Sequence, residues 1–243
     1  MGKDSKIEWT HHTFNPWWGC AKVSEGCANC YAEAFSKRTG NQIWGPKAPR
    51  RFFGDKHWNE PLKWNHEALE AGEPRRVFCA SMADVFEDRV DLIEARDRLF
   101  KLIRNTSALT WLLLTKRPEN IVKLTANWLF PPNVWLGTSA ENQDRWDERV
   151  PILMDIPCSV HFVSAEPLLG GINMVNHSPE WLIVGGESGP KARPMLHEWV
   201  ESLKYQCAST GTHFFFKQWG GKDKKAAGRE LHGRTFNEIP QAA

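Results

Sequence analysis

The sequence predicts an α/β protein built on an open, partial barrel of parallel strands, of the (β/α)6 type. Short apolar runs recur along the chain and end in small or polar residues, which is typical of strands buried on both faces of a parallel sheet. Segments with helical spacing lie between these runs, and such alternation indicates right-handed βαβ units. Six or seven strands are too few to close an eight-stranded barrel. The strands are expected near 7–13 and at 76–81, 109–116, 134–139, 161–166, 181–187 and 213–218.

Helices are expected at 31–38, 91–104 and 196–206, where apolar residues recur at broadly helical spacing. Two segments depart from the pattern. Residues 44–65 are rich in Pro, Gly, aromatic and basic residues, and we expect a long insertion loop or lid there. Residues 220–243 form a basic C-terminal extension with Lys222, Lys224, Lys225, Arg229 and Arg234. The whole chain, 1–243, is expected to form a single domain.

The composition narrows the range of functions. A net charge of +2 gives no global basic field that would demand a nucleic-acid partner. No apolar run approaches the roughly 20 residues that span a bilayer. The polar N-terminus leads into no signal-peptide core, so we expect a cytoplasmic protein without a membrane partner.

The six cysteines are unevenly distributed. Cys20, Cys27 and Cys30 lie within eleven residues, whereas Cys79, Cys158 and Cys207 are scattered. This distribution favours a metal-binding trio in a reducing compartment over a disulfide framework. Three thiolates leave one ligand position open. His11, His12 or a distant cysteine could complete a zinc site, whereas a [4Fe–4S] cluster would keep one iron free for a substrate or cofactor.

A three-cysteine loop after the first strand, followed by a partial barrel, resembles the radical S-adenosylmethionine (SAM) superfamily. Six residues rather than the usual three separate Cys20 from Cys27, which makes this a widened form of the motif. The resemblance implies a [4Fe–4S] cluster on Cys20, Cys27 and Cys30, SAM chelated by its unique iron, and a reductant such as flavodoxin or ferredoxin. Nearly the whole chain also resembles a phage-encoded family of uncharacterised radical SAM-like proteins, through segments 15–20, 79–86, 114–118 and 215–221.

A more distant resemblance to spore photoproduct lyase, which repairs a thymine lesion, implies SAM contacts. In that enzyme a Ser after strand two, a Lys after strand three and a Ser after strand four contact SAM, and Ser81, Lys116 and Ser139 correspond by position. Lys116 can neutralise the methionyl carboxylate, while the hydroxyl groups can donate hydrogen bonds. Gly185 and Gly186 lack side chains, so we expect the adenine to approach their backbone.

Two carboxylates and one cysteine are further candidates. Glu166 and Glu187 would hold the sulfonium or the substrate, with a structural role as the alternative for each. Glu187 and Cys79 are also the candidates for a catalytic role. Since Cys79 alternates with Val77, we expect its thiol to face the barrel interior, where it is either a hydrogen-atom donor or, as is more usual for such a cysteine, an inert small hydrophobe.

The predicted activity is reductive cleavage of SAM to methionine and a 5′-deoxyadenosyl radical, which abstracts hydrogen from a substrate. Residues 50–53, 56–58 and 63–64 interleave bases with aromatics, a combination that grips phosphates and stacks bases. With the lyase resemblance, this favours a nucleobase or nucleotide as substrate, in DNA modification or repair, presented as a flipped base or by a partner protein. In the alternative view the loop only packs over the barrel mouth.

Two other functions compete with this prediction. The first is a non-catalytic, zinc-stabilised nucleic-acid-binding protein that uses the trio and one histidine. The second is a hydrolytic α/β barrel in which Glu166 and Glu187 act as general acid and base. The hydrolytic function leaves the clustered cysteines unexplained.

Overall fold

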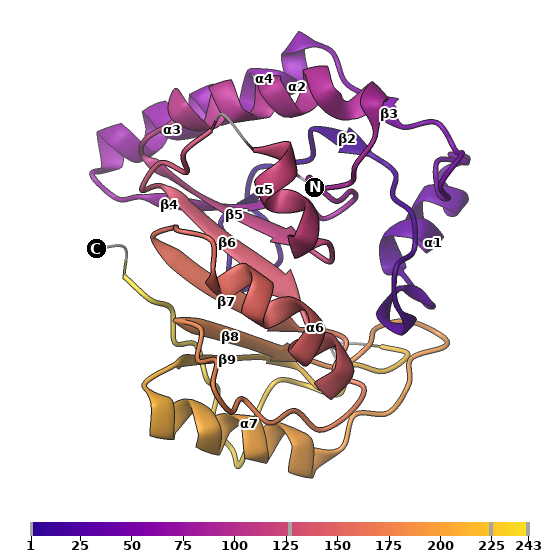
Figure 1. Ribbon diagram of the computed structural model, residues 1–243, viewed down its shortest axis with the longest axis vertical. Helices are drawn as coiled ribbons and strands as arrows, with labels where there is room; N and C mark the ends of the chain where they lie inside the picture. The colour runs from indigo at the N-terminus through magenta and orange to yellow at the C-terminus, as the bar shows by residue number, and fades with distance from the viewer. Residues whose placement is uncertain (1, 126–127, 224–225, 242–243) are drawn as a thin grey trace.

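A computed structural model describes residues 2–125, 128–223 and 226–241 of the chain. Its main sheet has seven strands that are all parallel to their neighbours and follow one another in chain order, so the predicted open half-barrel is confirmed (Figure 1). The strands are β1 (His12–Thr13), β4 (Arg75–Cys79), β5 (Leu109–Thr115), β6 (Val134–Ser139), β7 (Val160–Ala165), β8 (Trp181–Gly185) and β9 (His213–Gln218).

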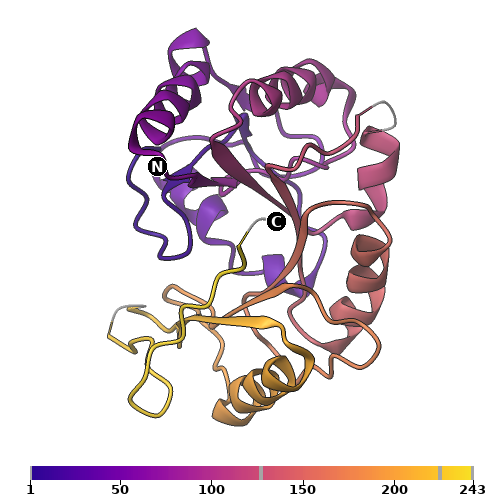
Figure 2. The ribbon, with the colours of Figure 1, turned by 90° about the vertical axis from the view of Figure 1, so that its left-hand side faces the viewer.

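Helices surround the outer face of this sheet in an arc, which is visible when the molecule is turned by 90° (Figure 2). The α-helices are α1 (Tyr31–Arg38), α2 (Asp55–Trp58), α3 (Glu60–Ala71), α4 (Ile93–Arg104), α5 (Ile121–Leu124), α6 (Gln143–Met154) and α7 (His197–Thr210). Short 3-10 helices are η1 (Glu25–Cys27), η2 (Val90–Leu92) and η3 (Pro118–Asn120). Between β7 and β8, residues 166–180 contain no helix.

Strand alternation divides the apolar side chains between two layers. Val77, Leu113 and Val184 point outward and pack against the helices, whereas Phe78 and Leu112 point into the barrel. The inward cluster is strongly aromatic near the amino ends of the strands. We call Trp9, Trp135 and Trp181 the tryptophan plug; all three are buried inside the barrel with Phe162 and Phe215.

The predicted insertion loop at 44–65 is wrong over its second half. Asp55–Trp58 and Glu60–Ala71 are helical, with Pro61 in the first turn of α3, where its missing N–H costs nothing. Trp58 and Trp64 are buried against the sheet, and this burial stabilises the helices. In the first half, β3 (Arg51–Phe52) pairs antiparallel with β2 (Trp17–Trp18).

The first predicted strand, near 7–13, is shortened to His12–Thr13. The C-terminal extension returns along β9: the Phe216 N–H donates to the Phe236 carbonyl at 3.0 Å, and Leu231 is fully buried. Of its predicted basic residues, Lys224 and Lys225 lie outside the described residues. No helix in the described part of the chain has the length and apolar character needed to cross a membrane.

Candidate functional site

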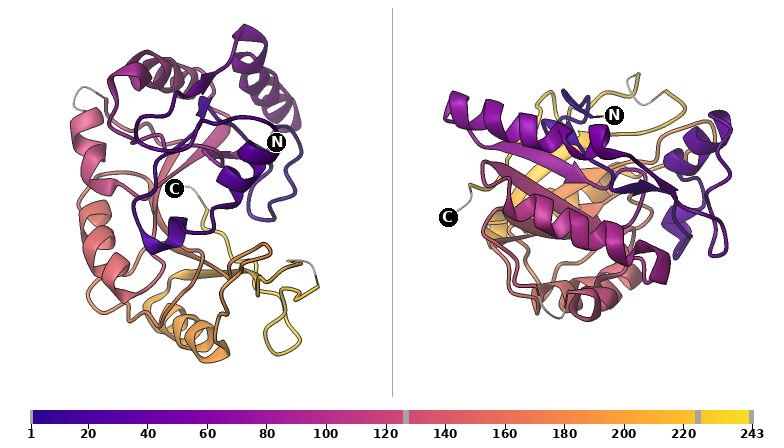
Figure 3. Two further views of the ribbon diagram at one scale, coloured as in Figure 1. Left: turned by 90° about the vertical axis from the view of Figure 1, so that its right-hand side faces the viewer. Right: turned by 90° about the horizontal axis from the view of Figure 1, so that it is seen from above.

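The cysteine trio lies on a loop between β2 and α1, beyond the carboxyl ends of the strands. In Figure 1, α1 lies past the arrowheads of the sheet, and Figure 3 shows this N-terminal segment in front when the molecule is viewed from that side. The loop begins at Gly19, whose N–H donates to the Met82 carbonyl at 2.9 Å. Gly19 has a φ of +114°, and a Cβ there would lie 2.4 Å from the Ile43 carbonyl oxygen, so only glycine fits.

Three side chains fasten this loop to three different strand ends. Arg117, after β5, donates to the Cys20 Sγ at 3.8 Å and to the Ala21 carbonyl at 2.8 Å. Ser24 donates to Glu141, after β6, at 2.9 Å. Asn29 donates to Glu187, after β8, at 3.0 Å. The loop is therefore held across the mouth of the half-barrel.

Arg117 is itself held by the buried carboxylate of Asp84. This carboxylate accepts hydrogen bonds from the Thr115 hydroxyl at 2.7 Å, the Lys116 N–H at 3.1 Å and the Arg117 guanidinium at 2.8 Å. Burial lowers the pKa of Arg117, but the charge of Asp84 and the contact with Cys20 together outweigh it, and the pKa is raised. A fixed positive charge therefore contacts the Cys20 sulfur.

Glu141 is the centre of a second charged group. Its side chain is completely buried, and it forms ion pairs with Lys116 and with Arg149, the latter at 3.1 Å. A Cβ at Gly26 would lie 2.2 Å from the Glu141 carboxylate, so glycine lets the cysteine loop approach it. Lys116, predicted to bind the SAM carboxylate, thus lies at the rim but is paired with a carboxylate of the protein.

The carboxylates of the second half of the rim are also paired. Lys217 lies 2.9 Å from Glu166, and the Ser164 hydroxyl donates to Glu166 at 3.3 Å. Arg193 contacts both oxygens of Glu187, at 2.6 and 2.9 Å. Burial raises the pKa of Glu187, but the hydrogen bonds from Arg193 and Asn29 outweigh it and hold the pKa below its usual value. An ionised, fully bonded Glu187 is a poor general acid, which disfavours the hydrolytic alternative.

The remaining predicted SAM contacts lie at the same rim. The Asn15 amide donates to the Ser81 hydroxyl at 3.1 Å, and Tyr31 donates to the Ser81 carbonyl at 3.0 Å. Ser139 is buried as the last residue of β6, and its carbonyl accepts from Arg149 at 2.9 Å.

The two glycines after β8 are explained by the packing of the protein itself. A Cβ at Gly185 would lie 2.5 Å from the Glu166 carboxylate, and one at Gly186 would lie 2.0 Å from the Trp219 carbonyl oxygen. Close approach by an adenine is therefore not needed to account for them, and that role stays a prediction.

Cys79 does not face the barrel interior, contrary to expectation. It is fully buried in the cluster between the sheet and the helices, with Val77 and Leu99. Strand alternation gives the interior to Phe78 instead. Burial raises the pKa of the Cys79 thiol. These surroundings suit an inert small hydrophobe rather than a hydrogen-atom donor.

His11 and His12 do not lie beside the cysteines. The His11 Nδ1 accepts from the Arg76 N–H at 2.8 Å, and the His12 Nδ1 accepts from the Asp4 N–H at 3.3 Å, next to the amino end of β4. Both lie beside residues 76–77 of β4, whereas the cysteine loop begins at Gly19 beside Met82, three residues beyond the end of that strand. Neither histidine can complete a zinc site on the trio, which removes the ligand that the zinc alternative required.

The donor set suits a group larger than one metal ion. All three thiols are partly exposed, and burial raises the pKa of Cys20 to about 12 and that of Cys30 in the same direction. Sulfur ligands of a single zinc ion would lie about 3.8 Å apart. Within the described residues, the trio does not form a group of ligand atoms within 4.8 Å of one another. The three sulfurs are therefore not all as close together as the ligands of one zinc ion, and three thiolates are the donor set that leaves one iron of a [4Fe–4S] cluster free.

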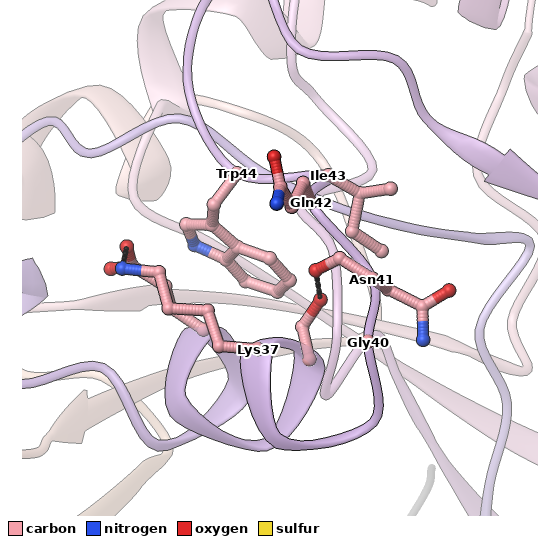
Figure 4. Close-up of a pocket in the computed structure, with 8 residues that line it drawn as sticks. Lys37, Gly40, Asn41, Gln42, Ile43 and Trp44 are labelled. Atoms are coloured by element: carbon pink, nitrogen blue, oxygen red, sulfur yellow. Dashed lines mark hydrogen bonds and ion pairs between the residues drawn. The ribbon is translucent and has the colours of Figure 1, made fainter.

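A cavity of about 410 Å³ is lined by α1 and by the segment that follows it. Figure 4 shows Lys37 and Trp44 at its wall, with Asn41 beside them. No cysteine lines this cavity.

Sequence reasoning missed the charged residues that organise the rim. Asp84 and Arg117 stand inside segments 79–86 and 114–118, whose resemblance was noted without assigning them a role. Glu141 follows a strand end by two residues, a position from which its contact with the cysteine loop 117 residues earlier cannot be read. Arg149 and Arg193 gave no signal of their own.

The fold and the site define an α/β half-barrel protein with a three-cysteine loop fastened over the carboxyl ends of its strands. The chain belongs to the family described as a protein of unknown function, DUF5131, which matches residues 4–240. No curated protein matches the sequence. The family description names no phage, and a phage-encoded origin stays a prediction.

Among solved structures, the chain is similar to variants of spore photoproduct lyase. One carries a tyrosine-to-phenylalanine substitution (14% identity, TM-score 0.48), and another carries a cysteine-to-serine substitution (13%, 0.49). A third, with a cysteine-to-alanine substitution, was determined with dinucleoside spore photoproduct (14%, 0.47). Each match covers 77% of this chain and 58% of the lyase chain, so the chain spans little more than half of that protein's length.

Proposed function

We propose that this protein is a radical SAM enzyme whose [4Fe–4S] cluster is held by Cys20, Cys27 and Cys30. The observation that carries the proposal is the cysteine loop itself, which side chains from three strand ends fasten over the mouth of a parallel half-barrel. What the bound cofactors supply is one electron to the sulfonium of SAM, yielding methionine and a 5′-deoxyadenosyl radical that removes hydrogen from the substrate.

The residues of the chain prepare this site in three ways. Arg117 places a positive charge against Cys20, which favours the thiolate that a metal ligand must be. Lys116 lies at the rim and can exchange its pairing with Glu141 for the methionyl carboxylate of SAM. Ser81 follows β4 and Ser139 ends β6, on the two sides of β5, where their hydroxyl groups can bond to the amino group or the ribose.

The second half of the rim supplies the proposed substrate side. Glu166 pairs with Lys217 and Glu187 pairs with Arg193, and such pairs can orient a cationic sulfonium or a polar substrate. We propose that the adenine of SAM approaches the backbone of Gly185 and Gly186. A flavodoxin or ferredoxin would supply the electron. The six free thiols fit a reducing compartment, in keeping with a cytoplasmic location.

For the substrate we propose a nucleobase or nucleotide, in DNA modification or repair. The supporting surface is smaller than the sequence suggested, because Trp58 and Trp64 are buried and Arg50 is bound to Glu87 at 2.6 Å. What remains exposed is Arg51, stacked 4.9 Å over the Trp18 ring, beside the half-exposed Phe52. A cation on an aromatic platform suits a phosphate next to a stacked base.

The test of the enzyme begins with anaerobic purification and reconstitution with iron and sulfide. We expect about four irons per chain, and 5′-deoxyadenosine after addition of SAM and dithionite. The variant Cys20→Ala/Cys27→Ala/Cys30→Ala should lose both. The matched control is Cys158→Ala/Cys207→Ala, which removes two cysteines outside the site and should keep both. A colourless wild-type chain with one bound zinc and no 5′-deoxyadenosine would contradict the proposal.

The substrate is tested separately, by binding of a single-stranded oligonucleotide at several salt concentrations. Arg51→Ala should weaken binding and reduce the slope of log affinity against log salt by about 1. Arg104→Ala removes an exposed arginine at the C-terminal end of α4. It should change neither the affinity nor the salt slope. Equal effects of the two variants would remove nucleic acid from the proposal while leaving the SAM chemistry intact.

A further inference from the structure

A second cluster of metal-ligating side chains lies away from the cysteines, on the outside of α7. His197 and Glu201 are four residues apart on this helix, so they share one face. His232 joins them from the turn of the C-terminal extension in which Leu231 and Arg234 form an isolated bridge. One ligand atom from each residue lies within 4.8 Å of the other two.

The contacts inside this trio are incomplete as hydrogen bonds. The Glu201 Oε1 atom is buried from solvent, and no N–H or O–H is aligned to donate to it. Yet the His232 Nε2 lies 2.5 Å from that oxygen and the His197 Nδ1 lies 3.9 Å from it. A buried carboxylate oxygen faced by two ring nitrogens without an aligned proton is what a shared cation would explain.

We propose that His197, Glu201 and His232 bind a divalent transition metal ion, zinc by preference. Two imidazoles and one carboxylate form a set that zinc takes at about 2.0 to 2.2 Å, with its fourth position open to water. Ligand atoms around such an ion lie about 3.4 Å apart, so the separations of 2.5 and 3.9 Å bracket the required value. Small side-chain rotations complete the site.

This ion would tie the C-terminal extension to α7. His197 stacks on Trp219, with 5.1 Å between ring centroids, and Trp219 directly follows β9. Two residues further on, the Gly221 N–H donates to the carbonyl of Glu187 at 2.7 Å. Metal binding on the outer surface would therefore fix the segment that packs against the rim at Glu187. The site is structural, and it stands whether or not the SAM proposal is correct.

The test uses the full chain with Cys20→Ala/Cys27→Ala/Cys30→Ala, so that metal cannot bind to the cysteine loop. Cobalt(II) is titrated as a spectroscopic probe and displaced with zinc, and thermal unfolding is measured with zinc and with a chelator. Glu201→Gln and His232→Ala are compared with His66→Ala. His66 is a matched control, because it pairs with Glu70 at the same four-residue spacing, 3.2 Å apart, without a third ligand among the described residues.

We expect one cobalt ion per chain, without thiolate-to-metal charge transfer, and a zinc-dependent rise in Tm. Loss of an outer-shell partner costs about 10- to 100-fold in metal affinity, and Glu201→Gln and His232→Ala, which remove direct ligands, should cost at least as much. His66→Ala should bind like its parent. Because each Tm shift is measured within one variant, a loss of basal stability does not obscure the result. Equal affinity in all variants, or no zinc-dependent shift in the parent, would overturn the proposal.

Discussion

The two ends of the half-barrel differ in the kind of side chain that fills them. Near the amino ends of the strands, the interior is filled by the tryptophan plug, Trp9, Trp135 and Trp181, with ring centroids 6.0 Å apart in each contact with Trp181. At the carboxyl ends, the buried carboxylate of Glu141, which is paired with Arg149, accepts a hydrogen bond from Ser24 of the cysteine loop. Apolar packing therefore fills the barrel at the amino ends of the strands. Hydrogen bonds and ion pairs order the carboxyl ends, and these interactions depend on geometry, as a binding or catalytic site requires.

The largest effect on stability is expected at the tryptophan plug. Trp181→Ala removes the ring that contacts Trp9, Trp135, Phe162 and Phe215, and it should cost about 3–5 kcal/mol of unfolding free energy. The iron content per folded chain should stay the same, because the plug does not touch the cysteine loop. Denaturant unfolding and iron analysis measure the two quantities. If loading fell in proportion to stability, the two ends would not be independent.

At the other end, Glu141→Gln should be nearly as damaging to stability. It leaves Arg149 buried without its carboxylate partner, at a cost of about 3 kcal/mol, near the lower limit for breaking a buried ion pair. Ser24 also loses a charged acceptor, so iron loading should fall as well. Glu70→Gln, which alters an exposed pair with His66 on α3, is the control and should cost less than about 1 kcal/mol. A Glu141→Gln chain that loads iron normally would show that this contact does not order the loop.

Arg117→Met distinguishes an effect on iron loading from an effect on stability more clearly than Glu141→Gln does. It removes the cation beside Cys20 while keeping much of the side-chain volume. We expect iron affinity to fall by about 10- to 100-fold, as for other outer-shell partners of a metal site, with a stability loss of about 2 kcal/mol from the unpaired Asp84. The comparison is with Arg104→Met on the exposed face of α4, which should alter neither quantity.

The smallest predicted effect lies at the amino end and depends on pH. Burial, followed by the charges of Arg76 and Arg75, lowers the pKa of His11 from 6.5 to about 4. Between these values the unfolded chain binds a proton that the folded chain does not, so His11 makes stability fall as the pH drops from 6.5 toward 4. His11→Gln should flatten this part of the profile by about 1 kcal/mol in urea unfolding curves. An unchanged slope would mean that His11 is charged in the fold.

The fold could be predicted because the signals that fix it are local. Continuous apolar runs such as Leu109–Thr115 and the helical spacing in Ile93–Arg104 are readable in one window of sequence. The segment 55–65 misled, because its proline and charged residues conceal Trp58 and Trp64, whose burial against the sheet stabilises the helices. Tertiary packing decided there, as it commonly does for short helices.

The sequence predicted which of the candidate residues lie at the rim, but not which residues they contact there. Strand ends placed Ser81, Lys116 and Glu187 at one rim. Which charge meets which was not readable, because Lys116 finds Glu141 and Glu187 finds Arg193 through geometry that only the closed loop creates. The direction of Cys79 was wrong for a related reason: alternation along a strand defines two faces without saying which one faces the helices.

The long reach of the contacts made by the cysteine loop also sets an order of events during synthesis. Along the sequence, Arg117 follows Cys20 by 97 residues, Glu141 follows Ser24 by 117, and Glu187 follows Asn29 by 158. The loop is synthesised before all of these partners, and its last anchor follows 168 residues later, since Arg193 donates to the Glu25 carbonyl. Whatever the three thiols bind, their native surroundings are complete only after Arg193 has been made, so maturation of this centre follows synthesis of β8.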